Sequence, residues 1–255
     1  MDPATLALFL LATVIGSYVQ SVTGFAMGMI IIAVTVGGGV VSVPIITAVV
    51  SLLSLVNIVL ALRGHGHHLQ RRLFVWTAIG MMPAVVVGVW LLTRLDARAQ
   101  WLVELLLGIF IVVGSLSMLV RPRPLARLSP PWACLTAGFS GGVLGGMFSA
   151  SGPVLGWFNY RQPLMVAEIR TTLLAGFALT TSLRTVVVGS GGGLTGEVWV
   201  MFLTGLPLVL LGTWAGRSFP PPVSEFALKR VAFTLLLIMG AWSIVRAALR
   251  ASAGG

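Results

Sequence analysis

Two short polar stretches interrupt long apolar runs in this chain, and they hold the side chains best suited to binding an anion. Residues 147–160 read MFSASGPVLGWFNY, in which Ser149, Ser151 and Gly152 come just before Pro153. Proline is favoured in the first turn of a helix and serine or glycine just before it, so the pattern predicts a new helix at Pro153. The free N–H groups and the positive dipole end of that helix would face the preceding hydroxyls, which is the arrangement of an anion site.

The second polar stretch lies near the start of the chain. Residues 17–29 read SYVQSVTGFAMGM and place the amide of Gln20 and the hydroxyls of Ser21 and Thr23 ahead of Gly24 and Gly28. A single hydroxyl in an apolar helix usually bonds to its own backbone, but clusters at equivalent places of two repeats favour a shared site. Irregular backbone at membrane depth must face protein or a wet cavity. The two stretches are therefore predicted to meet near the centre of the protein.

The composition shows which solvent these stretches lie in. Hydrophobic residues make up 57% of the chain and charged residues 9%, whereas about 25% of a soluble domain is charged. An all-α, polytopic membrane protein is predicted. The net charge of +10 does not indicate nucleic-acid binding, because the arginines lie mostly in short gaps between apolar blocks. Eight such blocks, hence about eight transmembrane segments, run roughly over 4–34, 42–62, 73–93, 100–120, 131–158, 164–188, 198–216 and 226–249.

Internal similarity divides the eight blocks into two homologous four-segment repeats. MMPAVVVGVW ends at Trp90 and GLPLVLLGTW ends at Trp214, and the same offset places Gly28 on Gly152. The repeats cover residues 1–128 and 129–255, and each opens on an interrupted first segment. Duplicated halves around a central site are a common plan for transporters. The alternative is that glycine and proline recur because transmembrane helices favour them.

The fifth block is too long for a simple crossing. Ser149 lies eighteen residues after Pro131, which is about 27 Å along a helix. Two geometries are open: the helix is long, tilted and broken, or it turns inside the protein and re-enters.

Further polar groups lie inside the apolar blocks. A charge at the bilayer centre costs at least ~2.5 kcal/mol, so Arg184 in the sixth block is a candidate counter-charge for an anion. The alternative is that Arg184 reaches the cytoplasmic surface. Asn57 aligns with Thr181 at the repeat offset, and both are included in the expected site. Glu104 is either a proton-coupling group or an interfacial glutamate.

The basic gaps predict the orientation in the bacterial inner membrane. The gaps 63–72 and 121–128 and the C-terminal tail are rich in arginine. With eight crossings, all three lie on the side of the N-terminus, so both termini are expected in the cytoplasm. The first gap also holds His65, His67 and His68, which lack a nearby cysteine or carboxylate and are interpreted as part of a solvated loop rather than a metal site. Cys134 is the only cysteine, which excludes an intrachain disulfide.

These motifs resemble the TauE/SafE sulfite exporter family of membrane transporters. A glycine-rich segment opens each repeat of that family, here VQSVTGFAMGM and GGVLGGMFSASGP, and a basic loop follows the second helix, here RGHGHHLQRR. The resemblance covers essentially the whole chain. It implies transport of sulfur-containing or related organic anions such as sulfite, sulfonates or sulfoacetate.

The sequence therefore predicts a transporter of small anions that uses alternating access about the two interrupted segments. No cofactor or metal is expected; the expected partners are a small anion and the lipid bilayer, and self-association is left open. Two other classes are considered, a structural or assembly subunit of a membrane complex and an intramembrane enzyme. An enzyme would need a nucleophile–base or metal pair that the sequence does not offer. The residues expected to bind the anion are Gln20, Ser21, Thr23, Gly24, Asn57, Ser149, Ser151, Gly152, Thr181 and Arg184.

Overall fold

The fold is built from helices of very different lengths. The computed structural model describes residues 3–23, 25–37, 41–63, 66–119, 124–219 and 225–253, and within them it has no strand. The predicted all-α class is confirmed. The elements are α1 (Pro3–Thr23), α2 (Met27–Gly37), α3 (Val43–Leu62), the short 3-10 helix η1 (Gly66–His68), α4 (Arg71–Arg98), α5 (Gln100–Leu119), α6 (Pro131–Phe148), α7 (Gly152–Tyr160), α8 (Val166–Ser190), α9 (Gly196–Ser218) and α10 (Glu225–Ala253).

Several of these helices suit the interior of a membrane. Five described helices, α3, α4, α5, α8 and α9, are long and apolar enough to cross it, and shorter apolar stretches lie in α1, α2 and α10. Large apolar side chains such as Val113, Val186 and Leu203 are more than half exposed on the outside of the bundle. Because so many apolar surfaces face outward, the chain is a multi-pass membrane protein. Eight separate crossings are not confirmed.

The first and fifth apolar blocks are each split into two helices, at residues 24–26 and 149–151. The fifth block turns back on itself. The Gln162 side chain accepts a hydrogen bond from the Ser129 N–H (3.0 Å) and donates one to the Ser129 hydroxyl (2.9 Å), so the end of α7 lies beside the start of α6. Of the two geometries left open by the sequence, the structure has the second, a turn inside the protein followed by re-entry. This block is therefore a helical hairpin rather than one crossing.

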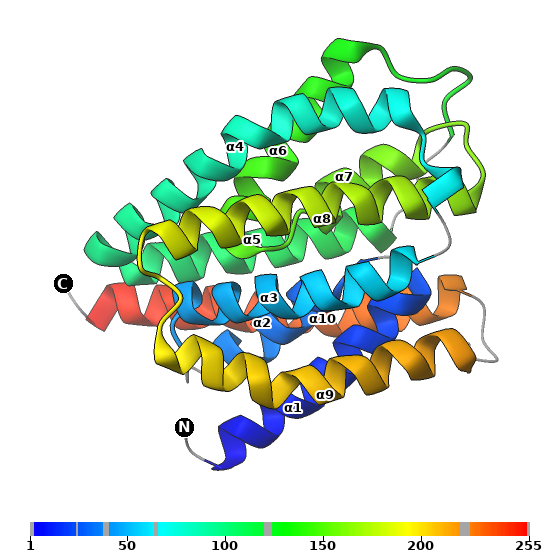
Figure 1. Cartoon of the computed structure of the whole chain (residues 1–255). Coiled ribbons are helices and arrows are strands. Elements are labelled where there is room, and N and C mark those ends of the chain that lie inside the picture. The colour runs from blue at the N-terminus through cyan, green and yellow to red at the C-terminus, as the bar shows by residue number, and fades with distance from the viewer. Residues whose placement is uncertain are drawn as a thin grey trace.

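The first block forms a similar hairpin. The N–H of Met27, the first residue of α2, donates to the side chain of Gln20 in α1 (3.2 Å), so α2 starts alongside the last turns of α1. The far end of α2 lies by α10, where Arg246 donates to the carbonyl of Val36 (3.1 Å). In Figure 1 the N-terminus and this end of α2 lie at the same end of the molecule.

Close helix contacts tie each hairpin to a distant helix. Helix α6 packs against α4, where glycines such as Gly138 leave no room for a side chain beside Thr77. Helix α1 packs in the same way against α9, where Gly212 lies against Ser17. Small residues allow backbones to approach closely, which drives helix association in lipid. Helices α5 and α10 also pack together, and they run antiparallel, since Gly108 lies by Ile244 whereas the later residue Ile111 lies by the earlier residue Gly240.

The two ends of the bundle differ in charge. Both termini lie at one end, on the left of Figure 1, which we call the terminal face. The loops 66–70, 124–130 and 161–165 lie at the other end, which we call the basic face, and contacts such as Gln70 N–H to Thr172 (3.1 Å) and Leu125 N–H to the Arg161 carbonyl (2.7 Å) join them. Arginines near the basic face are Arg63, Arg71, Arg72, Arg127, Arg161, Arg170, Arg217 and Arg230. Those near the terminal face are Arg94, Arg98, Arg246 and Arg250.

Candidate functional site

The two helix breaks touch each other at the centre of the bundle. A side chain on Gly28 would lie 2.9 Å from the carbonyl oxygen of Ser149, and one on Gly152 would lie 3.4 Å from the ring of Phe25. Each break contains one non-glycine residue with positive φ, Ala26 at 94° and Ser149 at 53°. Such backbone is uncommon for residues with a side chain and is typical of functional sites. The structure thus brings together the two polar stretches identified in the sequence.

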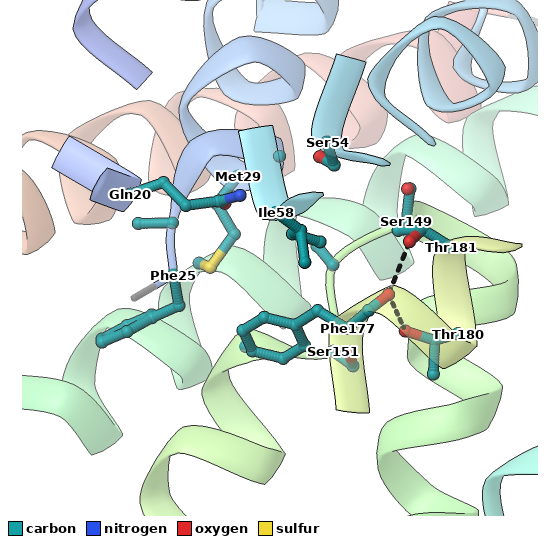
Figure 2. A pocket seen from close by; sticks show the side chains of 14 residues that line it. Gln20, Phe25, Met29, Ser54, Ile58, Ser149, Ser151, Phe177, Thr180 and Thr181 are labelled. Atoms are coloured by element: carbon teal, nitrogen blue, oxygen red, sulfur yellow. Dashed lines mark hydrogen bonds between the residues drawn. The ribbon is translucent and has the colours of Figure 1, made fainter. Parts of the chain in front are cut away.

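A small cavity lies between the two breaks. Its volume is about 30 Å³, enough for a water molecule or two. In Figure 2 the rings of Phe25 and Phe177 lie on one side of this space, and Ser149, Thr180 and Thr181 on the other. Helices α2 and α7 both begin at its wall, so the positive ends of two helix dipoles are directed at it. The lining residues are Gln20, Phe25, Ala26, Gly28, Met29, Ser54, Ile58, Ser149, Ala150, Ser151, Gly152, Phe177, Thr180 and Thr181.

Two buried serines in the cavity wall have hydroxyls that make no hydrogen bond to any described residue. Ser54 on α3 and Ser151 at the start of α7 are each 4% exposed, and neither side chain makes a hydrogen bond within the described part of the chain. By contrast, the Thr180 and Thr181 hydroxyls donate to carbonyls of their own helix. Polar groups in a protein interior nearly always bond to protein or to ordered water, so two hydroxyls that face one cavity in this way are suited to binding a ligand or water in it.

Arg184 lies behind the cavity wall and is 1% exposed. Its guanidinium donates to the carbonyls of Gly146 and Thr47 (both 2.8 Å), to the Thr47 hydroxyl (2.6 Å) and to the Ser51 hydroxyl (2.8 Å). All of these acceptors are neutral, and no ion pair with Arg184 is found among the described residues. The alternative that this side chain reaches the surface is therefore wrong. A buried charge without an opposite charge is costly, and a bound anion nearby would lower that cost.

A serine pair connects this arginine to the cavity. The Ser51 hydroxyl lies 2.9 Å from the hydroxyl of Ser149, which lines the cavity. The Ser51 hydroxyl accepts a hydrogen bond from Arg184, and its single proton has two acceptors within reach, the Thr47 carbonyl (2.9 Å) and the Ser149 hydroxyl. When this proton turns to Ser149, the Ser149 proton can point at the cavity. The charge of Arg184 can thus act on the cavity through two hydroxyls, although the guanidinium does not line it.

The other residues that the sequence predicted for the anion site differ in whether they line the cavity. Gln20 lines the cavity and donates to Asn57 (2.8 Å), which lies one layer further out and donates to Thr213 (2.7 Å). Ser21 donates to the carbonyl of Ser17 in its own helix (2.7 Å) and does not line the cavity. The side chain of Thr23 and the whole of Gly24 lie outside the described residues. Ser149, Ser151, Gly152 and Thr181 all line the cavity.

Two expectations outside the cavity can also be compared with the structure. Glu104 lies in α5, where its carbonyl accepts a hydrogen bond from Ser243 of α10 (3.3 Å), and it is not among the cavity residues. The rings of His67 and His68 lie with centroids 4.0 Å apart and planes tilted by 44°, and His65 lies outside the described residues. Within the described ranges, no group of three possible metal ligands is found.

Sequence reasoning missed Ser54 and the two rings of the cavity wall. Ser54 shares a face of α3 with Ser51 and Asn57, since the three residues are spaced three apart. That polar stripe in an otherwise apolar helix was the available signal. Phe25 and Phe177 carried no signal, because a phenylalanine in an apolar block is expected to pack in the core.

A cavity with polar groups in its wall, between two broken helices in a bundle of apolar helices, is typical of a membrane transporter with a central binding site. The comparisons with known proteins agree. Residues 8–243 match the family Sulfite exporter TauE/SafE. The chain is 43% identical over 226 residues, which is 89% of its length and 88% of the relative's, to a "Probable sulfite/organosulfonate exporter TauE" of Cupriavidus necator. This chain belongs to the sulfite exporter TauE/SafE family and is a membrane transporter, not an enzyme. No solved structure matches it.

Proposed function

We propose that the protein exports small sulfur-containing anions, sulfite or organosulfonates, and binds them in the cavity between the two helix breaks. The substrate class rests on the family and on the name of the relative from Cupriavidus necator. The observation that carries the site is the meeting, at one cavity, of two helix starts and the hydroxyls of Ser54 and Ser151, which have no hydrogen-bond partner within the described residues. Helix N-termini and hydroxyls are the usual ligands of oxyanions in proteins.

The cavity favours anions and offers nothing that repels them. The chain has six acidic residues, and none of them is among the lining residues. Arg184 lies behind the cavity wall and is joined to it by hydrogen bonds through Ser51 and Ser149. Because no carboxylate lines the cavity, proton-coupled transport through an acidic side chain at this site is not available. Export of an anion from a cell with a negative interior is favoured by the membrane potential alone, at about 2.3 kcal/mol per charge and 100 mV.

The cavity is too small for an anion with several oxygens in the present conformation, so binding requires one side to open. The architecture supplies two candidate moving parts, the α1–α2 and α6–α7 hairpins. Repeats of residues 1–128 and 129–255, arranged with inverted orientation, would explain why each hairpin packs on the third long helix of the other repeat, α1 on α9 and α6 on α4. They would also explain why α5 and α10, which are equivalent in this scheme, run antiparallel. Alternating access in inverted repeats is rocking of one part against the other about a fixed site.

The orientation follows from the hairpins and differs from the expectation based on eight crossings. If both hairpins enter and leave at one face, the gap 63–72 and the C-terminal tail lie on opposite sides of the membrane. They cannot then both be cytoplasmic. The basic face carries the larger share of the arginines, so we propose that this face is cytoplasmic. Both termini then lie on the opposite, non-cytoplasmic side of the bacterial inner membrane.

Reconstituted protein tests the proposed function directly. Liposomes loaded with sulfite should release it when a potassium diffusion potential makes their interior negative, and taurine, which carries no net charge, should not be driven out in this way. Ser151→Asp should abolish release, because its carboxylate occupies the place of the anion at the start of α7. Ser190→Asp, at the exposed end of α8, is the matched control and should release sulfite normally. Normal release by Ser151→Asp would contradict the site, and no release by unaltered protein would contradict the function.

A further inference from the structure

A second, much larger cavity opens on the outside of the bundle, between α5 and the α6–α7 hairpin. Its volume is about 520 Å³, within the range of about 300–1,000 Å³ typical of small-molecule pockets. The walls are almost wholly apolar and include Phe110 and Val113 of α5, Phe148 of α6, and Pro153 of α7. Val113 is 60% exposed, so the cavity faces the surroundings of the bundle and not its centre.

A third cavity, of about 330 Å³, continues the second one toward the basic face. The two share Val154 and Trp157 of α7, and the third cavity then reaches Arg161 and the hydroxyls of Thr136 and Ser140. Val154 and Arg161 are seven residues apart, which is about 10 Å along the helix axis. One groove therefore changes from apolar to polar and basic over this distance.

Arg161 is held at the polar end of the groove with its charge available. Its guanidinium carbon lies 4.5 Å from the centre of the Trp157 ring, and its carbonyl accepts a hydrogen bond from the Leu125 N–H (2.7 Å). No ion pair with Arg161 is found among the described residues. Tryptophan and arginine together are typical of the level at which lipid headgroups lie.

We propose that this groove binds an anionic phospholipid, with an acyl chain in the apolar cavity and the phosphate at Arg161. The order of the walls, apolar and then hydroxyl-bearing and then basic, matches the order of groups in a phospholipid. A small anion would have no use for the apolar part, and a purely apolar occupant would leave the arginine unpaired. The acyl chain would contact Phe148 and Pro153, which flank the break at 149–151. Bound lipid would therefore stabilise the α6–α7 hairpin.

The test measures lipid retained by the purified protein in detergent, by native mass spectrometry during titration with phosphatidylglycerol or phosphatidylcholine. Unaltered protein should retain phosphatidylglycerol in preference to phosphatidylcholine. Arg161→Gln should bind phosphatidylglycerol about fivefold more weakly, as expected for one basic residue near a headgroup. Val154→Trp, which fills the shared part of the groove, should weaken binding of both lipids.

Arg94→Gln is the matched control. Arg94 also lies over a tryptophan, 5.7 Å from the centre of the Trp90 ring, but it is near the terminal face and does not line the groove. The Arg94→Gln protein should retain phosphatidylglycerol as the unaltered protein does. Equal retention of the two lipids, or equal affinity in Arg161→Gln and Arg94→Gln, would overturn the proposal. So would a stable dimer of the delipidated protein that Val154→Trp dissociates, because a second copy of the chain would then cover the groove.

Discussion

The ring of Phe25 stacks on the ring of Phe233, with 5.5 Å between their centroids and 23° between their planes. Phe110 and Phe148 stack with nearly the same geometry, at 5.5 Å and 21°. Phe25 and Phe148 each lie beside a helix break, and their partners lie on the antiparallel helices α10 and α5. The sequence separation between Phe25 and Phe148 equals that between Phe110 and Phe233. It is one residue shorter than the separation between Trp90 and Trp214 in the repeated tryptophan motifs. The pairs therefore occupy equivalent places in the proposed repeats, but only Phe25 lines the central cavity.

This difference predicts that Phe25 closes the cavity on its side. In a Cys134→Ser background, the thiol introduced by Ser151→Cys should react slowly with a methanethiosulfonate reagent, because Ser151 is buried. Adding Phe25→Leu should raise the reaction rate several-fold, since the smaller side chain leaves a gap beside Phe233 and Tyr160. Adding Phe148→Leu, the matched change in the other pair, should have a smaller effect. Equal rates in all three proteins would show that neither ring closes the cavity.

Contact between the two breaks predicts a strong effect of a single methyl group. Gly28→Ala would place a Cβ 2.9 Å from the Ser149 carbonyl and 3.1 Å from Val50. Overpacking of this kind costs about 1–3 kcal/mol, and it would separate the two helix starts. We expect a lower thermal unfolding midpoint and loss of sulfite binding. Gly196→Ala is the control, since nothing lies within 4 Å of its added methyl group. A Gly28→Ala protein that binds normally would mean that the breaks tolerate separation.

The meeting of the two breaks could be expected from the sequence because hydroxyls, glycines and prolines have strong local preferences. Ser151 and Gly152 before Pro153 indicate a helix start whatever surrounds them. The hairpins could not be derived in this way, because an apolar block of 28 residues fits a tilted crossing as well as a re-entrant turn. The tie between Gln162 and Ser129 that fixes the turn is a tertiary contact over 33 positions. Orientation depends on the number of crossings, so the expected side of the termini depends on which geometry the hairpins take.

The hydroxyls of Ser54 and Ser151 predict an effect on binding without an effect on stability. Ser54→Ala and Ser151→Ala should each weaken sulfite binding by about 0.5–1.5 kcal/mol, the net value of one hydrogen bond. Neither change removes a hydrogen bond within the described part of the chain, so the unfolding midpoint without ligand should not fall. Ser190→Ala is the control, because the Ser190 hydroxyl donates to the Val187 carbonyl of its own helix and does not line the cavity. Isothermal titration and thermal unfolding of the same samples provide both measurements. A stability loss without a binding loss would mean that the hydroxyls serve packing.

The charge difference between the two faces predicts where reporters will be active. A reporter fused at residue 125 should report cytoplasm, because this loop lies at the basic face. A reporter at the C-terminus should report the outside of the membrane. Cytoplasmic signals from both fusions would restore eight crossings and would contradict re-entrant hairpins. The alkaline phosphatase and green fluorescent protein pair is suited to this comparison, because each is active on one side only.

The hydrogen bonds of Arg184 predict that lysine cannot replace it. Its guanidinium uses Nε, Nη1 and Nη2 to join α8 to Thr47 and Ser51 of α3 and to the carbonyl of Gly146 in α6. A lysine ammonium keeps the charge but lacks the planar fork, so it can hold at most part of this network. The Ser51–Ser149 pair would then lose its orientation, and sulfite binding should weaken at least about tenfold, since a hydrogen bond to a charged group contributes about 1.5–3 kcal/mol. Arg184→Gln should be worse, because the positive charge near the anion is lost as well.

Membrane insertion and the unfolding midpoint of each variant separate a local effect from misfolding. Arg94→Lys serves as the control because Arg94 is exposed. Its sulfite binding should equal that of the unaltered protein. If Arg184→Lys folds and binds sulfite normally, the charge alone suffices and the proposed relay through Ser51 is wrong. If Arg184→Gln also binds normally, Arg184 holds the helices together and has no part in attracting the anion.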